Sequence, residues 1–531
     1  MPFNSVSDDM CSQFMAAPSS DRTVSLCSSV PVRLSRDPLV LLRLLVLVGA
    51  CAMIGAYLFV ALSRIGHPFA LEPLEGAVVD HIARWRSAEP FWIAPTLDWT
   101  PFLYPPGYYI ASSAVASIVG DGFVAPRAVS LASSIGVLAL IALTVRHETG
   151  RWQGGLLAAG LFAATFEASG DWMDIGRVDS LFLFLALSAT MLVRRATSAW
   201  TMALAGGVLS AAFLTKQGAV FFAAPLTLWA LWQKPRHGLV LAGVFVGLSG
   251  AIYLAATLAT DNWYHFYLFD VPSRHPPVPP VWTTYWTKDL LGSTPVLCVL
   301  AVICLPLSPG VRPKGNAFIA ALLVCGICMS YVSRLKAGGV LNALMPAFAV
   351  LAIAAGMVAD TPGPGWRRLA RAGTVIAIGL QLYLLSYHER IASKIPTEAD
   401  RVAGNRAVAA LRQVEGRVFL PTRGHMLALA GKKPCAHMAA MKDIVELVRT
   451  SRPGERANTA SMSLSKEFLD AAVGRRFAAI VADEDLASNP LQAQFDKNYV
   501  LAKQLITEPD VLITVVKPGT RPQFLYLLRR P

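Results

Sequence analysis

Acidic, basic and aromatic side chains gather in residues 71–109, directly after an apolar run. The segment holds the acids Glu72, Glu75 and Asp98, and Tyr104 lies near its end. Because Trp and Tyr concentrate at membrane–water interfaces, a polar, proline-interrupted segment rich in both suits the edge of a membrane. Carboxylates held there could serve chemistry on a lipid-linked substrate. The plain alternative is a solvated amphipathic helix with ordinary charge pairs.

A second acidic cluster, residues 171–179, precedes a later apolar run, and Asp179 stands at the start of that run. Two acidic clusters that face one cavity could hold a divalent cation or act as base and orienter. We assign no metal ligand and no certain cofactor. The candidate catalytic acids are Glu75, Glu72 and Asp179.

Basic residues supply the complementary charge. Lys216 lies between two apolar runs, where a charged residue is costly and therefore marks a functional-site candidate. Arg and Lys donate charge-assisted hydrogen bonds to phosphate oxygens. The alternatives are snorkelling of Lys216 to the headgroups and general attraction to anionic lipids. The candidate substrate-binding residues are Asp98, Tyr104, Asp174, Arg177, Lys216, His265, Arg274, His275, Lys336 and Asn342.

The composition places these residues in a membrane protein. Of 531 residues, 54% are hydrophobic and 15% charged, whereas soluble domains average about 25% charged. The net charge of +13 is explained by Lys and Arg in cytoplasmic loops, and no nucleic-acid-binding motif is present. The cysteines are scattered, so no disulfide framework follows.

Apolar runs then set the architecture. A Ser-rich segment, residues 1–38, is predicted to be a disordered cytoplasmic tail. The first run, 39–62, has a basic flank and the length of a membrane span. Ten further runs fall at 126–145, 153–168, 179–195, 199–214, 218–233, 238–259, 291–308, 316–332, 340–359 and 370–388.

The loops between the runs alternate between short basic segments and longer segments of mixed charge. This alternation predicts about 11 spans, with the N-terminus cytoplasmic and loop 63–125 on the outer side. Residues 106–120 should then lie at the outer interface without crossing completely. Residues 261–289 are expected to form a long outer loop.

Hydropathy falls after about residue 390. Short strand-like runs at 416–421, 477–483, 511–517 and 524–529 alternate with amphipathic stretches such as 464–473. This order predicts a small α/β domain over residues 391–531, placed extracytoplasmically by the charge argument. The predicted fold class is a polytopic α-helical membrane protein, with a transmembrane domain over 39–390 and this C-terminal α/β domain.

The order of several short motifs resembles the GT-C class of integral-membrane glycosyltransferases, in the branch of protein mannosyltransferases and aminoarabinose transferases. The matching pieces are Glu75-Gly76, Tyr104-Pro105-Pro106, Arg127 with Ser130, Arg177-Val178-Asp179, Lys216-Gln217, and Gly338-Gly339 with Asn342 and Pro346. The chain departs from the family's Asp-Glu pair, since it reads Glu72-Pro73-Leu74-Glu75.

The resemblance implies inverting transfer of a sugar from a polyprenyl-phosphate donor to a cell-envelope acceptor on the outer face of the cytoplasmic membrane. It places an acid of the first loop, best matched by Glu75, at the reaction centre, as base towards the acceptor hydroxyl or as metal ligand. It gives phosphate stabilisation to Lys216, with Arg274, His275 or Lys336 as further candidates. Two alternatives are a transporter or flippase of lipid-linked saccharides and a non-catalytic envelope assembly protein. A transporter would carry ionisable residues near the midplane and an inverted repeat, and neither is visible in the sequence.

Overall fold

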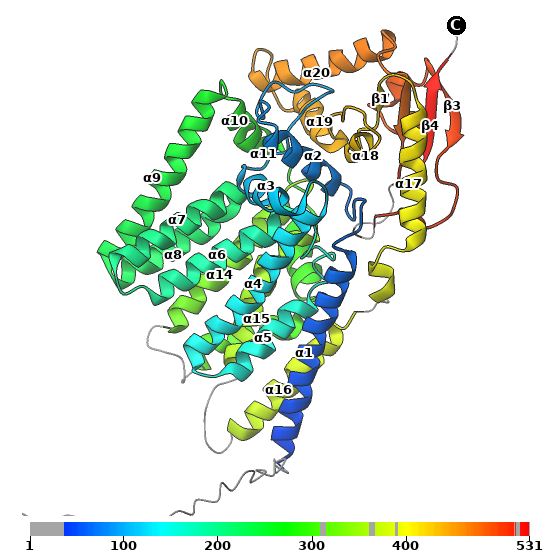
Figure 1. Cartoon of the computed structure of the whole chain (residues 1–531). Helices are drawn as coiled ribbons and strands as arrows, with labels where there is room; N and C mark the ends of the chain where they lie inside the picture. The colour runs from blue at the N-terminus through cyan, green and yellow to red at the C-terminus, as the bar shows by residue number, and fades with distance from the viewer. Residues whose placement is uncertain are drawn as a thin grey trace, which may run out of the picture.

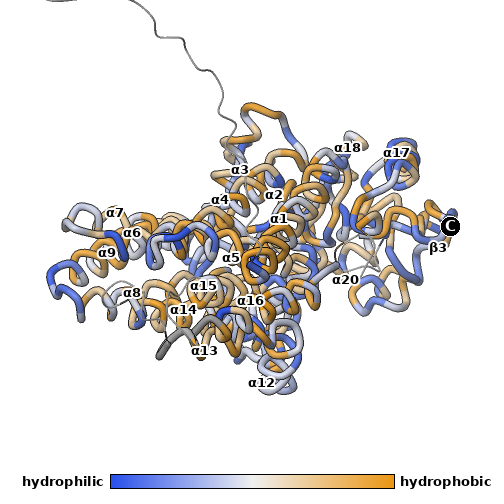
Figure 2. The backbone as a smooth tube through the Cα atoms, turned by 90° about the horizontal axis from the view of Figure 1, so that it is seen from below, coloured by the Kyte–Doolittle hydropathy of each residue, from blue (hydrophilic) through white to orange (hydrophobic). Residues whose placement is uncertain are grey.

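The computed structural model describes residues 37–307, 315–359, 367–387, 391–514, 516 and 521–529. The predicted tail lies outside these residues except for its last two positions. Figure 1 shows a bundle of helices with the C-terminal elements packed across one end of it. In Figure 2 the bundle is mainly apolar along its backbone, whereas blue, polar stretches are frequent around α17 (Glu398–Gln413) and β3 (Tyr499–Gln504).

Each of the eleven predicted apolar runs forms a helix. They are α1 (Pro38–Arg64), α4 (Val124–Thr149), α5 (Trp152–Ala164), α6 (Val178–Arg195), α7 (Ala199–Thr215), α8 (Val220–Gln233), α9 (Pro235–Ala259), α13 (Pro295–Leu307), α14 (Gly315–Leu335), α15 (Met345–Ala359) and α16 (Arg367–Leu384). Among the described residues, five helices, the last of them counted from Leu341, are long and apolar enough to cross a membrane, or six if one bent pair is a single span. Four more apolar helices in the same ranges are shorter. The protein is thus a multi-pass membrane protein, and the predicted number of 11 spans stays a prediction.

The core of the bundle is α15, whose side chains are almost all buried. A helix that is apolar on every face suits either such a central position or contact with lipid, and α15 takes the central one. Glycines let its neighbours approach closely. A Cβ on Gly356 of α15 would lie 2.4 Å from the Gly154 carbonyl oxygen of α5, and one on Gly160 of α5 would lie 2.4 Å from Ala50 Cβ of α1. Small residues at such crossings allow the van der Waals packing on which helix association in membranes depends.

A break in the chain between α7 and α8 is central to the site. α7 ends at Thr215, Lys216 adopts an extended backbone (φ −153°, ψ 127°), and a short turn, η1 (Gln217–Ala219), leads into α8. The runs 199–214 and 218–233 are therefore separate helices, as predicted. The break places the Lys216 side chain at the end of two helices.

The first loop contains two helices, α2 (Glu75–Arg86) and α3 (Gly107–Val119). They lie between the bundle and the C-terminal elements in Figure 1. With 13 residues, α3 is about 20 Å long, shorter than the roughly 30 Å hydrocarbon core. This length agrees with a helix that does not cross completely.

The predicted long loop at 261–289 is mostly helical turns. They are α10 (Trp263–His265), the π-helical η2 (Phe266–Asp270), α11 (Val271–Arg274), α12 (Val281–Thr284) and the π-helical η3 (Tyr285–Leu290). The segments 281–290 and 295–303 meet at a bend of 91°. Its aromatic side chains divide into two sets, since Tyr264, Phe266, Tyr267 and Tyr285 are buried whereas Phe269, Trp282 and Trp286 are exposed.

The C-terminal part forms a four-stranded sheet with helices around it. The strands are β1 (Val418–Phe419), β2 (Ala479–Ala482), β3 and β4 (Phe524–Leu528), in the order β1-β2-β4-β3. β1 and β2 are parallel, and the other pairs are antiparallel. The further helices of this part are α18 (Gly424–Leu429), α19 (Met438–Val445) and α20 (Arg456–Val473), with short turns η5 (Ile391–Lys394), η6 (Glu446–Arg449), η7 (Leu486–Ser488) and η8 (Ala493–Phe495). The remaining short turn, η4 (Leu341–Leu344), lies in the bundle and leads into α15.

Three of the four predicted strands are present, at β1, β2 and β4. The prediction at 511–517 is wrong for its described residues, because Asp510 and Leu512 have positive φ angles of 57° and 55°, which a strand does not allow. This segment instead reaches α17, where Leu512 N donates to Asp400. The fourth strand, β3, escaped prediction because it is an exposed edge strand, buried only at Tyr499.

Candidate functional site

Acids of the two predicted acidic clusters meet at the end of the bundle that faces the C-terminal elements, and five of them form ion pairs with bases there. The pairs are Glu72–Arg177, Glu75–Arg127, Asp171–Lys394, Asp174–Arg64 and Asp179–Lys216. They come from the first loop, from the segment 165–177 between α5 and α6, from the ends of α1, α4, α6 and α7, and, for Lys394, from the short turn η5. We call these ten residues the charge cluster.

Glu75 has all its hydrogen-bonding capacity engaged. Its carboxylate accepts Arg127 Nε at 2.9 Å and Nη2 at 2.8 Å, and it also accepts the backbone N–H groups of Leu71 at 2.7 Å and Gly176 at 2.9 Å. The residue has no exposed surface. Burial alone raises the pKa of this carboxyl, but the Arg127 charge and these hydrogen bonds outweigh burial and hold the pKa below its ordinary value.

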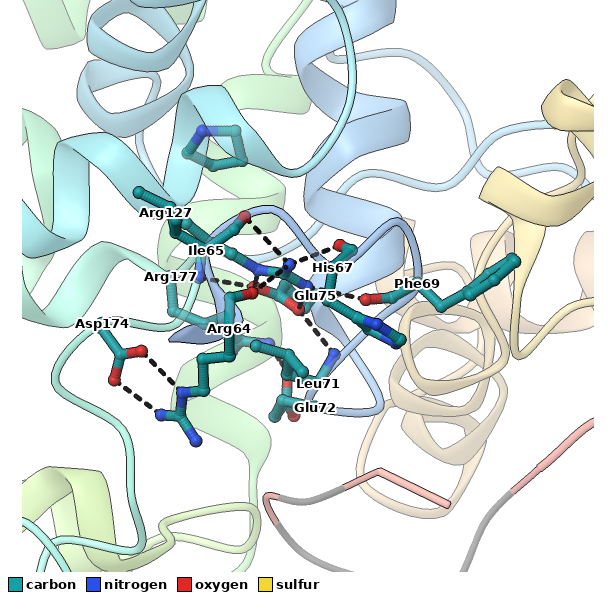
Figure 3. A network of polar contacts seen from close by, with 12 residues as sticks. Arg64, Ile65, His67, Phe69, Leu71, Glu72, Glu75, Arg127, Asp174 and Arg177 are labelled. Carbon is teal, nitrogen blue, oxygen red and sulfur yellow. Dashed lines mark hydrogen bonds and ion pairs between the residues drawn. The ribbon is translucent and has the colours of Figure 1, made fainter. Parts of the chain in front are cut away.

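Arg127 organises the turn that connects α1 to α2. Its guanidinium also donates to the carbonyl oxygens of residues 64, 65, 67 and 69, at 2.6–3.3 Å. Beside it, Arg64 donates to both Asp174 oxygens at 2.7 and 2.6 Å and to the Asp171 carbonyl at 2.7 Å. Figure 3 shows the backbone of this turn curling around the Arg127 side chain. These two pairs therefore hold the first loop in its fold.

Arg177 is held more loosely. Its Nη1 lies 3.3 Å from Glu72 and its Nη2 lies 3.4 Å from the Tyr104 hydroxyl, while its buried Nε–H has no partner among the described residues. The guanidinium lies 5.5–5.9 Å from the ring centres of Phe102, Tyr104 and Trp172. Burial lowers the pKa of Arg177, but Glu72 and other neighbours raise it above its ordinary value. Arg177 is thus a charged donor with an unused hydrogen bond.

Asp179 orients Lys216, a second base of the charge cluster. One of its oxygens accepts Lys216 Nζ at 2.7 Å, and the other accepts Trp172 Nε1 at 2.9 Å and Asn342 Nδ2 at 3.0 Å. The Lys216 side chain is 16% exposed, whereas the four other bases of the cluster are 0–4% exposed. Lys216 is also within electrostatic range of Tyr104 and Arg177. It is the base of the cluster that a ligand can reach most directly.

The structure brings Glu72, Glu75, Tyr104, Asp174, Arg177, Asp179, Lys216 and Asn342 of the predicted set together. It does not bring the other five into the charge cluster. Asp98 forms ion pairs with three bases, Arg417, Arg476 and Lys433. Arg274 pairs with Glu455, His275 with Asp443, and His265 with Asp270. Lys336 donates a hydrogen bond to the His275 carbonyl. Most of these contacts join loops of the bundle to the C-terminal elements.

Arg64, Arg127 and Lys394 are in the cluster but were not among the predicted site residues. Arg64 ends the first apolar run, and such a residue reads as a snorkelling flank. Arg127 belongs to a motif of the family resemblance, and the sequence alone gives it no separate role. Lys394 has no sequence signal, since only the fold brings it to Asp171 at 3.0 Å and to Glu167 at 3.3 Å.

The charge cluster does not fit a divalent cation. Within the described ranges no group of three or more His, Cys, Asp or Glu side chains could hold a metal ion. Every acid of the cluster also has a basic partner, so the donor set lacks the surplus negative charge that a hard cation requires. The ion pairs of the cluster thus leave its carboxylates to the bases and not to a cation.

Comparison with known proteins agrees with the resemblance predicted from the sequence. Residues 104–263 match the family model of dolichyl-phosphate-mannose-protein mannosyltransferase. This range includes Tyr104, Arg127, Arg177, Asp179 and Lys216. No curated protein sequence matches the chain.

Among solved structures, ArnT from Cupriavidus metallidurans in the apo state has a TM-score of 0.54 at 12% identity, covering 90% of this chain and 97% of that chain. The same protein bound to undecaprenyl phosphate gives 0.47 at 15% identity, with the same coverage. The archaeal oligosaccharyltransferase AglB from Archaeoglobus fulgidus, with an inhibitory peptide and a dolichol-phosphate, gives 0.47 at 12% identity, covering 84% and 69%. The apo ArnT match shows a shared fold.

Proposed function

We propose that the protein is a membrane glycosyltransferase. It transfers a sugar from a polyprenyl-phosphate-linked donor to a cell-envelope glycan, lipid or protein on the outer face of the cytoplasmic membrane. One observation carries the proposal. Arg177 and Lys216, two bases with donor capacity to spare, lie near the Tyr104 hydroxyl within the segment that matches the mannosyltransferase family.

In this proposal the donor phosphate binds Lys216 and Arg177. Both donate charge-assisted hydrogen bonds to phosphate oxygens, and their low-dielectric surroundings strengthen this interaction as negative charge develops on the leaving group. Asp179 holds the Lys216 ammonium in place through its 2.7 Å contact. Asn342 and Trp172 in turn fix the Asp179 carboxylate.

The reaction proposed is a single displacement. The acceptor hydroxyl oxygen forms a bond to the anomeric carbon as the bond from that carbon to the phosphate oxygen breaks. The electron pair leaves with the lipid monophosphate, the hydroxyl proton passes to the Glu72 carboxylate, and the anomeric configuration inverts. Glu72 becomes the stronger base when the phosphate draws Arg177 away from its 3.3 Å contact.

This assignment moves the base from Glu75 to Glu72. The Glu75 carboxylate has its four hydrogen bonds filled by Arg127 and two backbone N–H groups. To accept a proton it would have to break the turn that Arg127 holds. Glu72 accepts the backbone N–H of Leu74 at 2.9 Å and shares Arg177 with the proposed phosphate site. Its exchange of Arg177 for a proton leaves the turn that Arg127 holds in place.

The test uses the purified protein in nanodiscs with a panel of polyprenyl-phosphate sugars and a membrane-extract acceptor. Release of free lipid phosphate is followed for the wild type, for Lys216→Met and for Lys497→Met, a control at an exposed lysine. We expect release from one donor class that is lost in Lys216→Met and unchanged in Lys497→Met. Folded wild-type protein that releases lipid phosphate from no donor would contradict the proposal and favour transport.

A further inference from the structure

Three contacts between described residues join the C-terminal elements to the acid-bearing segment of the first loop, residues 71–76. Val516 N donates to the Leu71 carbonyl at 2.9 Å. His437 lies 3.2 Å through Nε2 from the Pro73 carbonyl oxygen, and the ring of His425 packs on Gly76. All three contacts lie within four residues of Glu72.

The hydrogen bonds of His437 determine which of its ring nitrogens carries the proton. Its Nδ1 accepts the N–H of Ala439 at 3.1 Å and caps α19, so the ring proton must sit on Nε2, where it donates to Pro73. Burial lowers the pKa of His437 to about 4, so the ring stays neutral. The His437 ring also packs edge-on against the Phe102 ring, at a centroid distance of 5.7 Å. Phe102 is one of the aromatic residues around the Arg177 guanidinium. One side chain therefore touches the backbone next to Glu72 and the wall of the proposed phosphate site.

His425 makes a second, independent contact with the segment. It is 3% exposed, and a Cβ on Gly76 would lie only 2.2 Å from its Nδ1. Only glycine at position 76 lets the ring approach α2 this closely. The Phe123 ring supports His425 from another side, at a centroid distance of 5.0 Å and an angle of 86°.

We propose that His437 and His425 are positioning residues for Glu72, so that the C-terminal elements complete the site of the bundle. The inference rests on the proposed function for its kinetic test. The two side chains act through the backbone of residues 73–76, and neither is assigned a contact with substrate. Their geometric role can be measured without activity.

The kinetic test compares His437→Phe, which keeps a ring but removes the donor, with His437→Gln, which offers an N–H in its place. We expect kcat to fall about tenfold in His437→Phe with KM for the donor nearly unchanged, because one hydrogen bond near the base is lost. The glutamine variant should recover most of the rate. His237→Phe, at the far end of α9, is the matched control. Equal kcat in the wild type and His437→Phe would overturn the inference.

A second test needs no turnover. Hydrogen–deuterium exchange of the peptide covering residues 70–80 should rise in His437→Phe and stay unchanged in His237→Phe. If wild-type protein proves inactive but this exchange rises, the positioning role stands and the proposed function fails. Unchanged exchange would overturn the positioning role, whatever the activity.

A pair of size changes tests the His425 contact. Gly76→Ala should lower kcat and raise exchange in the same peptide, because its methyl group would overlap the His425 ring. Adding His425→Ala to Gly76→Ala should restore part of both quantities, since the space of the ring becomes free. A double variant as impaired as the sum of the single variants would overturn the proposed contact.

Discussion

Two arginines of the charge cluster pair with glutamates of one short segment, yet they are held very differently. Arg127 makes two bonds of 2.8–2.9 Å to Glu75 and several more to backbone carbonyls. Arg177 makes contacts of 3.3 and 3.4 Å to Glu72 and Tyr104 and keeps a buried N–H without a described partner. We call an ion pair saturated when all its hydrogen-bond donors and acceptors have partners, and unsaturated when one of them has none. A saturated pair stabilises the fold, whereas an unsaturated pair can exchange partners with a ligand.

The energetics of burial explain why both kinds can coexist. A buried ion pair repays its desolvation only if the geometry is good and the remaining donors and acceptors are satisfied. Arg127 and Glu75 meet that condition. Arg177 does not meet it in this structure, and a phosphate in contact with it would. Substitutions at the two arginines should therefore separate stability from turnover.

The largest effect is expected at the saturated pair. Glu75→Ala leaves Arg127 buried without its counter-charge, which costs about 3–5 kcal/mol and should abolish most folded protein. Thermal unfolding followed by size-exclusion chromatography measures this. Glu89→Ala, in an exposed pair with Arg84, should unfold like the wild type. A stable Glu75→Ala protein that lacks only turnover would make Glu75 the catalytic acid and contradict the comparison.

The next effect is expected at the unsaturated pair. Arg177→Met should lower kcat/KM for the donor about 10²–10³-fold, the usual cost of removing one donor to a developing anion. Its thermal stability should fall less than that of Arg127→Met, because its bonds are fewer and longer. Lipid phosphate release and thermal unfolding of both variants check this. Equal losses of thermal stability in the two variants would show that Arg177 stabilises the fold as much as Arg127 does.

A smaller effect is expected one contact away from the bases. Asn342→Ala removes one of three donors to Asp179, so Lys216 should be less well oriented. We expect kcat/KM to fall about tenfold, equivalent to a single hydrogen bond to a charged group, with little change in stability. Steady-state kinetics with the active donor give the answer. An unchanged kcat/KM would show that Asn342 does not help Asp179 to orient Lys216.

The smallest effect is expected outside the charge cluster. Arg274→Ala breaks a partly exposed pair with Glu455 and a bond to the Thr450 carbonyl. Such pairs contribute little, so kcat/KM should stay within about twofold of the wild type. A loss as large as that of Arg177→Met would return Arg274 to the phosphate site.

The sequence predicted the helices and much of the cluster, because apolar runs and charges at their ends are local signals. It identified Lys216 and Asp179 by their places at helix ends. The partners Arg64 and Lys394 could not be predicted, since they meet Asp174 and Asp171 across separations of 110 and 223 residues. That Glu75 forms a fully hydrogen-bonded ion pair with Arg127 also could not be predicted, because a carboxylate with all its hydrogen bonds filled and a reactive one look alike in sequence. The prediction of a strand at 511–517 was wrong because apolar composition does not reveal a positive φ, such as that of Leu512.

The central claim is that Glu72 accepts the proton in sugar transfer while Arg177 and Lys216 hold the phosphate. The most direct test is single-turnover transfer at saturating donor by Glu72→Gln, which keeps the size of the side chain but removes the base. We predict that Glu72→Gln binds polyprenyl phosphate within about threefold of the wild type while its transfer step slows about 10²–10⁴-fold, the range for a lost general base. Transfer at the wild-type rate by folded Glu72→Gln protein would contradict the account.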